Sequence, residues 1–274
     1  MPEIADKKIV ITGANSGIGL EVMDLLLKKR GNIIFAVDLN IDNIVKFVER
    51  YENRVIPFKC DISNPENIDM IFGWAEDAMD GIDIFYANAG FSYYEEMNYV
   101  DWNRVQHMFA TNVFSPIYSY QKFVQHLNGR KGMFAVTGSA MGYMGMPGFT
   151  LYSSSKFAIN GFQEAIGLEK PDNVHIITLF PVATDTNFFS AASKLEFAKP
   201  YPLQTPDVVA YRMIRGMEKG KKKVQPCRLF SVAMLFFKIL PFTKTLYLRS
   251  EKKKFEAYRQ KTRIIEAHHT LDDQ

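Results

Sequence analysis

Apolar runs of strand length alternate with helical patterns over most of the chain. The runs predict strands at residues 8–12, 32–37, 54–60, 82–87, 132–137 and 174–180, and a seventh at 222–226. The segments between them predict helices at residues 17–30, 41–51, 65–79, 99–127 and 152–169. Near-continuous apolar strands separated by helices are typical of a parallel sheet that is covered on both faces. The chain is therefore predicted to be an α/β protein with a doubly wound parallel sheet of about seven strands.

The end of the chain breaks this alternation. Residues 229–240 form an almost wholly apolar run that stops before Pro241. As a helix this run would measure about 18 Å, which is short of the roughly 30 Å core of a bilayer. It fits a buried helix that closes a pocket, a contact in a dimer, or an element that dips into a membrane surface. We predict one α/β domain at residues 1–226 and an extension at residues 227–274, a helix followed by a tail.

Composition excludes several classes of protein. With 274 residues, of which 47% are hydrophobic and 23% charged, the chain can bury a large core and is neither disordered nor collagen-like. Cys60 and Cys227 cannot form a disulfide framework, no Cys/His cluster has zinc spacing, and His268 and His269 lie in the polar tail. Residues 1–8 are polar, and the apolar run after them is too short for a signal peptide. These features predict a cytoplasmic protein without a metal site.

Charge is distributed unevenly along the chain. The formal net charge is +3, but residues 215–263 hold 15 Lys and Arg against 3 Asp and Glu. Basic clusters at residues 219–223 and 252–254 flank the apolar run, which favours peripheral contact with anionic lipid. The alternative is that the run packs only against protein. No recognition motif supports binding of nucleic acid.

The turn between the first predicted strand and the first predicted helix is rich in glycine. Residues 12–19 read Thr-Gly-Ala-Asn-Ser-Gly-Ile-Gly. Glycines at such a turn let the backbone approach a pyrophosphate, and the helix N-terminus offers free N–H groups at the favourable end of its dipole. The candidate phosphate-binding residues are Gly13, Asn15, Ser16, Gly17, Ile18 and Gly19.

Asp38 ends the second predicted strand, 19 residues after Gly19. A carboxylate at that place accepts hydrogen bonds from the hydroxyls of an adenine ribose and repels a 2′-phosphate. No Lys or Arg occurs at residues 14–18 or 39–41 to offset that repulsion. The sequence therefore predicts NAD as the cofactor in preference to NADP.

Further polar and glycine residues stand at the ends of the later strands or in the helices that follow. In chain order they are Asn88, Ala89, Gly90, Asn112, Ser139, Tyr152, Lys156, Pro181 and Thr186. Together with the glycine turn, this order over about residues 7–226 resembles the short-chain dehydrogenase/reductase family. The resemblance implies a Rossmann-fold oxidoreductase that depends on NAD(P) and forms a homodimer or homotetramer.

The resemblance also implies roles for single residues. The catalytic set would be Asn112, Ser139, Tyr152 and Lys156, with Asn112 holding a water in a relay to Lys156. The implied cofactor contacts, besides the glycine turn and Asp38, are Asp61, Asn88, Ala89, Gly90, Tyr152, Lys156, Pro181 and Thr186. Family members usually have Pro-Gly after the sixth strand, where this chain has Pro181 and Val182.

Tyr152 and Lys156 lie four residues apart, so a helix places both side chains on one face. Free tyrosine has a pKa of about 10, too high for a base at neutral pH, and a nearby cation lowers it. Ser139 would orient the substrate oxygen. Tyr118 and Lys122 have the same spacing. Because no serine at a strand end precedes that second pair, we interpret it as ordinary helix surface.

The loops around the predicted site are rich in apolar side chains. They contain Phe91, Tyr93, Tyr94, Met141, Tyr143, Met144, Met146, Phe149, Phe188, Phe189, Leu195 and Phe197. These residues favour an apolar substrate, such as a lipid, acyl, steroid or retinoid-like molecule, or else they pack the loops or a dimer interface.

We predict an NAD-dependent oxidoreductase that interconverts an alcohol and a ketone. One alternative is a non-catalytic, NAD-binding regulator or scaffold of the same fold. Another is an epimerase or dehydratase acting on nucleotide sugars, which typically needs a longer C-terminal substrate domain.

Overall fold

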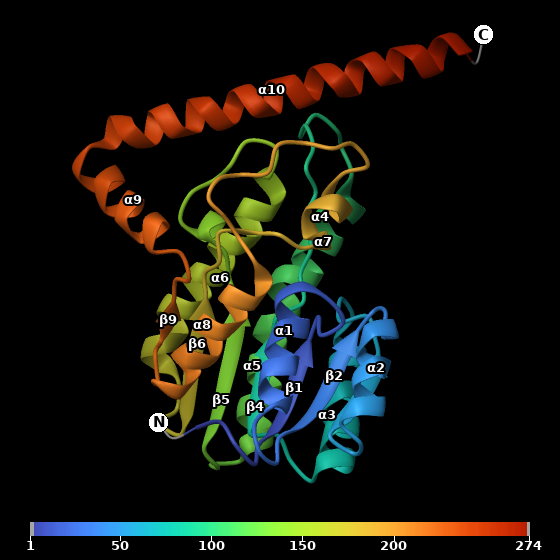
Figure 1. Cartoon of the computed structure of the whole chain (residues 1–274), viewed down its shortest axis with the longest axis vertical. Coiled ribbons are helices and arrows are strands. Elements are labelled where there is room, and N and C mark those ends of the chain that lie inside the picture. Colours follow the sequence, from blue (N-terminus) through green and yellow to red (C-terminus); the bar gives the residue numbers. More distant parts are fainter. Residues whose placement is uncertain (1–2, 273–274) are drawn as a thin grey trace.

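The computed structural model describes residues 3–272, and a seven-stranded parallel sheet forms its centre (Figure 1). The strands are β1 (Lys8–Thr12), β2 (Ile33–Asp38), β3 (Val55–Lys59), β4 (Ile84–Ala87), β5 (Gly132–Thr137), β6 (Val174–Leu179) and β9 (Lys223–Val224). Their order is β3-β2-β1-β4-β5-β6-β9. The order reverses between β1 and β4, as in a doubly wound fold, which confirms the predicted fold class. Pro57 lies in the edge strand β3, where a missing N–H is tolerated.

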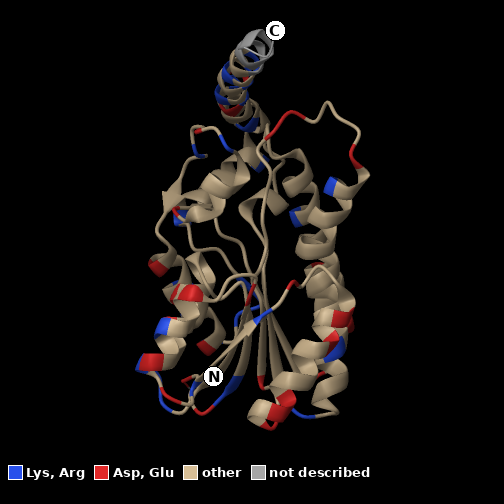
Figure 2. Cartoon of the chain, turned by 90° about the vertical axis from the view of Figure 1, so that its right-hand side faces the viewer, with Lys and Arg blue, Asp and Glu red and all other residues tan. Residues whose placement is uncertain are grey.

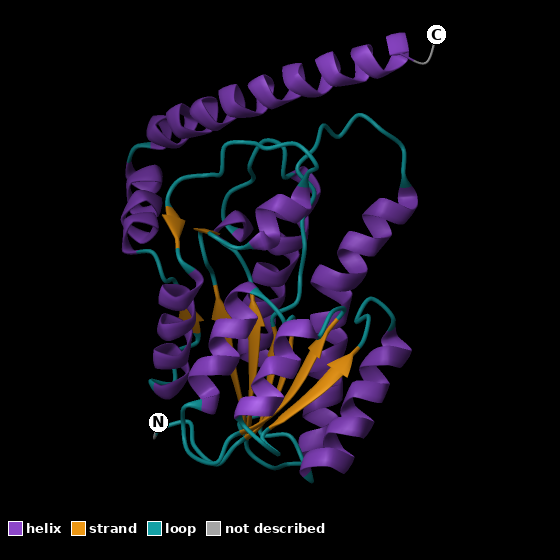
Figure 3. Ribbon diagram, turned by 45° about the vertical axis from the view of Figure 1, so that its right-hand side comes forward, coloured by secondary structure: helices purple, strands orange, loops and turns teal. Residues whose placement is uncertain are grey.

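Helices cover both faces of this sheet because its strands are apolar on both sides. Ile9 and Ile11 of β1 pack with α1 (Gly17–Leu27), α2 (Asp42–Arg50) and α8 (Pro206–Glu218) on one face. Val10, which lies between them, packs on the other face with α3 (Pro65–Met79), α5 (Ser115–Leu127) and α6 (Thr150–Glu169). The resulting three layers place the loops that follow each strand at one edge of the sheet (Figure 3).

Several short elements lie at this carboxyl edge of the sheet. A 3-10 turn at Ala140–Gly142 follows β5. After β6, the chain forms β7 (Ala183–Thr184), α7 (Asn187–Ala192) and β8 (Leu203–Gln204), and β7 pairs with β8. We call residues 185–202 the lid segment. It joins the two small strands and lies above the edge of the main sheet (Figure 1).

The helix predicted over residues 99–127 is not continuous. It consists of α4 (Trp102–Phe109), a π-helical turn at Ala110–Phe114, and α5. The Asp101 side chain caps α4 by accepting a hydrogen bond from Arg104 N at 3.0 Å. The wider turn rotates Asn112 relative to an unbroken α-helix, and such turns are often found at functional sites.

The C-terminal extension consists of two helices that meet at a corner. α9 (Arg228–Ile239) ends at Leu240, and Pro241 opens α10 (Pro241–Asp272), a 32-residue helix that crosses above the lid segment (Figure 1). The segment interpreted from sequence as a tail is therefore helical. His268 and His269 belong to α10, although their side chains lie outside the described ones. Within residues 3–272, none of the helices is both long enough and apolar enough to span a bilayer.

Candidate active site

The glycine turn after β1 has the geometry of a phosphate-binding loop. Gly13 and Gly17 have φ angles of +68° and +54°, which side chains of L-residues rarely adopt. A Cβ at Gly19 would lie only 2.0 Å from Gly13 O, so this position has room for glycine alone. The loop thus exposes its backbone at the start of α1. This observation fits a pyrophosphate, because a side chain at these positions would fill the space next to the helix N-terminus.

Partly buried hydrogen bonds fix the strand ends beside this loop. The hydroxyl of Thr12 accepts hydrogen bonds from Asn88 N at 3.1 Å and Ala89 N at 3.2 Å. The Asn88 side chain donates to Gly13 O at 3.1 Å and accepts from the Thr137 hydroxyl at 2.9 Å. The ends of β1, β4 and β5 are therefore locked to one another, and the turn at Asn88, Ala89 and Gly90 faces the glycine loop.

Asp38 stands at the end of β2 with its carboxylate held in place. Its oxygens accept hydrogen bonds from Asn15 N at 3.0 Å and from Asn40 N at 3.2 Å. Lys59 is the register partner of Asp38 in β3. This cation is close to Asp38 in the sheet but distant from it in the sequence. The Lys59 side chain does not line the cavity described below.

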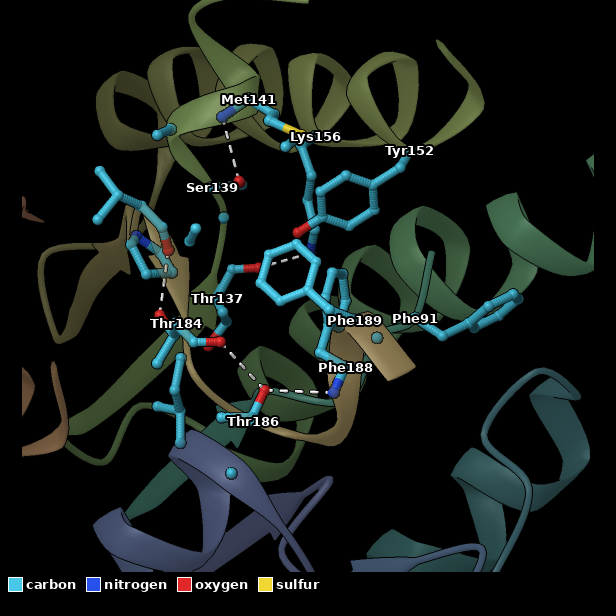
Figure 4. Close-up of a pocket in the computed structure, with 18 of the residues that line it drawn as sticks. Phe91, Thr137, Ser139, Met141, Tyr152, Lys156, Thr184, Thr186, Phe188 and Phe189 are labelled. Carbon is cyan, nitrogen blue, oxygen red and sulfur yellow. Dashed lines mark hydrogen bonds between the residues drawn. The ribbon is translucent and has the colours of Figure 1, made fainter. Parts of the chain in front are cut away.

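Tyr152 and Lys156 project from the first turns of α6 into the same space, close to Ser139 (Figure 4). The Lys156 Nζ lies 5.6 Å from the centre of the Tyr152 ring and donates a hydrogen bond to Thr137 O at 2.9 Å. The Ser139 hydroxyl accepts a hydrogen bond from Met141 N at 3.1 Å, which fixes its direction. The three residues predicted to act on substrate are thus brought together.

Burial dominates the proton equilibria of this pair. It raises the pKa of Tyr152 to about 12, and the neighbouring Ser139 hydroxyl only partly opposes this shift. Burial also lowers the pKa of Lys156 to about 8. Burial therefore outweighs any lowering of the phenol pKa by Lys156 in this structure, and the effect expected of Lys156 stays a prediction. At neutral pH, Tyr152 holds its proton and Lys156 is mostly charged.

Asn112 lies behind the catalytic pair and is buried. Its Oδ1 accepts a hydrogen bond from Phe91 N at 3.1 Å, and its Nδ2 donates to Phe91 O at 2.9 Å. The same amide reaches Ser155 Oγ at 3.2 Å. The π-helical turn therefore presents Asn112 so that it fixes the backbone that follows Gly90.

A single cavity of about 600 Å³ connects these features. Most of the predicted site residues line it, namely Gly13, Ser16, Gly17, Ile18, Asp38, Asp61, Asn88, Ala89, Gly90, Ser139, Tyr152, Lys156, Pro181 and Thr186. Asn15, Gly19 and Asn112 lie just outside and support the wall through the contacts given above. We call the part beside Gly13 and Asp38 the glycine-loop end and the part beside the lid segment the lid end.

Two groups of lining residues were missed by the sequence analysis. His107 and Thr111 reach the cavity from α4 and the π-helical turn. The second group comes from the C-terminal extension and consists of Leu229, Phe230, Ala233, Phe237 and Tyr247. The first four belong to the apolar run for which a helix that closes a pocket was one of the predicted alternatives, although no single residue of it was predicted to line the site. A periodicity of three to four in residues 230–237 is the one signal that could have shown an inward face of α9.

The apolar loop residues divide between the cavity and the packing around it. Phe91, Met141, Met144, Met146, Phe188 and Phe189 line the cavity. The others do not line it; Tyr94, Phe149 and Phe197 form an aromatic cluster with Phe255 and Tyr258 of α10. About half of the set therefore packs around the cavity, and the other half is placed where it could contact a substrate, whose apolar nature stays a prediction.

Val182 stands where family members have glycine, and its surroundings account for the difference. It is buried against Cys227 and Phe230, with Ala140 and Tyr143 beside it. The neighbouring backbone is hydrogen-bonded, since Pro181 O accepts a hydrogen bond from Ala140 N at 2.8 Å. The extra side chain therefore anchors the start of α9 to the loop after β6.

The second Tyr/Lys pair lies elsewhere. Tyr118 donates a hydrogen bond to Asp69 at 3.0 Å, and Lys122 forms an ion pair with the same carboxylate at 2.9 Å. Both lie between α5 and α3 and away from the cavity, which confirms that this pair is helix surface.

Comparison with known proteins gives one family. The family of the short chain dehydrogenases matches residues 7–196. The NADPH-dependent 1-acyldihydroxyacetone phosphate reductase of Saccharomyces cerevisiae is 35% identical over 187 residues, which cover 65% of this chain and 62% of that relative. The 3-ketodihydrosphingosine reductase of Mus musculus is 28% identical over 233 residues, covering 77% of this chain and 68% of the relative.

Solved structures share the fold at low sequence identity. A short chain dehydrogenase/reductase from Burkholderia phymatum in complex with NAD superposes with a TM-score of 0.77 at 17% identity, covering 89% of this chain and 97% of that one. A short-chain dehydrogenase from Sphingobium yanoikuyae in complex with NADPH gives a TM-score of 0.74 at 17% identity, covering 87% and 94%. These likenesses establish the arrangement of the sheet and its helices.

Proposed function

The chain belongs to the short-chain dehydrogenase family, and from this premise we propose that it interconverts an uncharged, apolar ketone and its alcohol with NAD(H). The observation that carries the proposal is the convergence of Ser139, Tyr152 and Lys156 on one wall of a cavity that also reaches Asp38. Asn112 completes the set from behind Gly90. A non-catalytic regulator would have no need for a buried phenol and amine beside an apolar cavity.

The residues divide the chemistry among them. A bound nicotinamide dinucleotide would supply the hydride, held by the glycine loop, Asp38, Asp61 and the turn at residues 88–90. Ser139 donates a hydrogen bond to the substrate oxygen and orients it. Tyr152 gives its proton to that oxygen as the carbon accepts the hydride. Lys156, as a cation, stabilises the phenolate that remains, and Asn112 holds a water that returns a proton through Lys156.

We propose reduction as the working direction, and the protonated phenol of Tyr152 suits the proton donor that reduction needs. A phenol with a pKa of about 12 is protonated at neutral pH, which is the form that a proton donor needs. Lys156 keeps its charge below about pH 8. The named relatives are reductases, which supports the same direction.

The lining of the cavity supports an uncharged substrate. Among the described residues that line it, Lys156 is the only Lys or Arg, and Asp38 and Asp61 are the only carboxylates. Both carboxylates lie at the glycine-loop end. The lid end is lined mostly by apolar side chains, with His107 and a few neutral polar residues such as Asn187. A phosphate group, such as the one in the name of the yeast relative's substrate, would meet no Lys or Arg among the described residues of that end.

The preference for NAD rests on Asp38. Asp38 lines the cavity, and no ion pair of its carboxylate with a Lys or Arg occurs among the described residues. The relatives differ in this respect, since the yeast reductase is NADPH-dependent and the solved structures hold NAD or NADPH. Assembly as a homodimer or homotetramer, a cytoplasmic location and peripheral contact with membranes complete the proposal.

A turnover screen tests the proposed function. Neutral long-chain ketones, matched ketones that carry a phosphate, and the corresponding alcohols are offered with NAD(H) and NADP(H) at pH 7. We expect turnover of the neutral apolar ketones with NADH and little turnover of the phosphate-bearing ones. Absence of turnover with every substrate, despite binding of NADH, would favour the non-catalytic alternative.

A further inference from the structure

α9 has two apolar faces with different surroundings. Its inner face contributes Phe230, Ala233 and Phe237 to the wall of the cavity. Its outer face exposes Val232, Phe236 and Ile239, whose exposed fractions are 50%, 52% and 64%. A soluble surface helix normally carries polar residues on its outer face. α9 therefore separates the apolar cavity from an apolar outer surface.

The outer apolar face continues around the corner into α10. Leu235 of α9, Leu240 between the helices, and Phe242 and Leu246 of α10 are also exposed. Figure 1 shows the two helices meeting at this corner, above and to one side of the sheet. We call these residues together with Val232, Phe236 and Ile239 the corner surface. Contiguous exposed apolar side chains on one side of a protein mark a site of interaction rather than ordinary surface.

The stretch of chain that carries the corner surface holds charge of one sign. Residues 228–250 contain Arg228, Lys238, Lys244 and Arg249 and no Asp or Glu. Farther along α10, the Glu251 carboxylate is buried and forms an ion pair with Lys254 at 2.6 Å. In Figure 2, further Lys and Arg follow along α10. An apolar patch surrounded by cations is complementary to a bilayer with anionic headgroups.

The basic cluster at residues 219–223 belongs to another part of the molecule. Lys221 O lies 3.1 Å from the His175 ring at the start of β6, and Lys223 forms an ion pair with Glu164. This cluster therefore lies at the amino edge of the sheet, whereas α9 follows the carboxyl end of β9. The cations that can act with the corner surface are those of α9 and α10.

We propose that the corner surface docks on an anionic lipid bilayer, with the outer face of α9 inserted among the headgroups. α9 then lies between the membrane and the lid end of the cavity. An apolar ketone dissolved in the bilayer would be separated from the cavity by this one helix. Docking is independent of the reaction proposed above because it requires no turnover.

Co-sedimentation with vesicles tests this proposal. The full chain is mixed with vesicles of phosphatidylcholine alone or with phosphatidylserine, at low and high salt. We expect binding to the anionic vesicles that weakens at high salt, because the surrounding cations are then screened. Replacing Lys238 by Ser should weaken binding about fivefold, the effect of one cation near an anionic surface.

A matched pair of double variants locates the surface. Val232→Glu with Phe236→Glu should weaken vesicle binding at least about tenfold, because the free energy gained by moving two apolar side chains from water into the bilayer is lost. Trp74→Glu with Leu168→Glu, at positions on α3 and α6 that are exposed by 58% and 90%, should leave binding unchanged. Turnover of a short, water-soluble ketone is measured for both variants and should match that of the unaltered protein, since none of the four residues lines the cavity.

Three results would overturn the proposal. One is the absence of binding to either kind of vesicle. Another is equal loss of binding in both double variants. The third requires that the unaltered protein is a stable dimer and that the double variant Val232→Glu with Phe236→Glu is a monomer that still binds vesicles as well as the unaltered protein does. That result would assign the corner surface to contact with a second copy of the chain. If the unaltered protein turned over none of the ketones, the proposed reaction would be contradicted, but the proposed docking would not.

Discussion

The two ends of the cavity are held in place by different kinds of interaction. At the glycine-loop end, partly buried hydrogen bonds of Thr12, Asn88 and Thr137 lock the ends of three neighbouring strands. At the lid end, aromatic packing and a few hydrogen bonds join segments that are distant in sequence. The Tyr258 hydroxyl of α10 contacts Ser193 in the lid segment at 2.9 Å and donates to Tyr94 O at 3.1 Å. The first end is therefore held mainly by hydrogen bonds between strand ends and the second mainly by aromatic packing.

This difference separates what the fold provides from what the extension provides. The glycine-loop end depends on the doubly wound sheet alone, so it suits a ligand common to many proteins of this fold. The lid end depends on α9 and α10, which supply part of its wall and hold the lid segment. Substitutions should therefore affect cofactor and substrate separately, except where both ends meet at Tyr152.

The largest effect is expected at Tyr152, which lies between the two ends. Tyr152→Phe keeps the ring and removes the proton donor, so kcat should fall at least about 10²-fold, the lower end of the range for general acid catalysis. Binding of NADH, measured by fluorescence titration, should stay within about twofold because the glycine-loop end is unchanged.

Tyr118→Phe is the matched control, since it removes a hydroxyl from the second Tyr/Lys pair and leaves the cavity untouched. Its kcat should equal that of the unaltered protein. If Tyr118→Phe were inactive and Tyr152→Phe active, the assignment of the catalytic pair would be wrong.

A smaller effect is expected at Asp38, which acts only at the glycine-loop end. Asp38→Ala removes charge-assisted hydrogen bonds and the repulsion of a 2′-phosphate. The ratio of kcat/KM for NADH to that for NADPH should fall about tenfold or more. Substrate KM with saturating NADH should not change.

Asp42→Ala removes an exposed carboxylate from the first turn of α2 and serves as the control for Asp38→Ala. The ratio of its kcat/KM for NADH to that for NADPH should equal the ratio of the unaltered protein. Equal use of the two cofactors by the unaltered protein would contradict the role proposed for Asp38.

The glycine-loop end and the catalytic residues could be predicted because their signals are short and ordered along the chain. Residues 12–19 form one turn, and Tyr152 and Lys156 are four apart in one helix. The structure places nearly all of them on a single cavity, as expected. The roles of these residues stay predictions until they are tested by substitution.

For the lid end, the sequence predicts that apolar and aromatic side chains are abundant, but it does not predict which of them contact one another. Tyr258 reaches Tyr94 across 164 positions in the sequence, so no local pattern could pair them. Phe255 and Tyr258 also lie among charged residues that resemble a solvated tail. The π-helical turn that presents Asn112 was missed because its sequence continues a helical pattern on both sides. In each case a tertiary contact determines what the local sequence leaves open.

The smallest effect is expected from the hydroxyl of Tyr258. Tyr258→Phe keeps the ring that packs 4.7 Å from the centre of the Tyr94 ring and removes the hydrogen bonds to Ser193 and Tyr94. Loss of an anchor worth about 0.5–1.5 kcal/mol should raise substrate KM roughly two- to tenfold. KM for NADH should not change, because no contact of Tyr258 reaches the glycine-loop end. Tyr211→Phe, on the exposed surface of α8, is the control and should alter neither constant. Equal shifts of both KM values in Tyr258→Phe would show that α10 stabilises the whole cavity, and the distinction between its two ends would then fail.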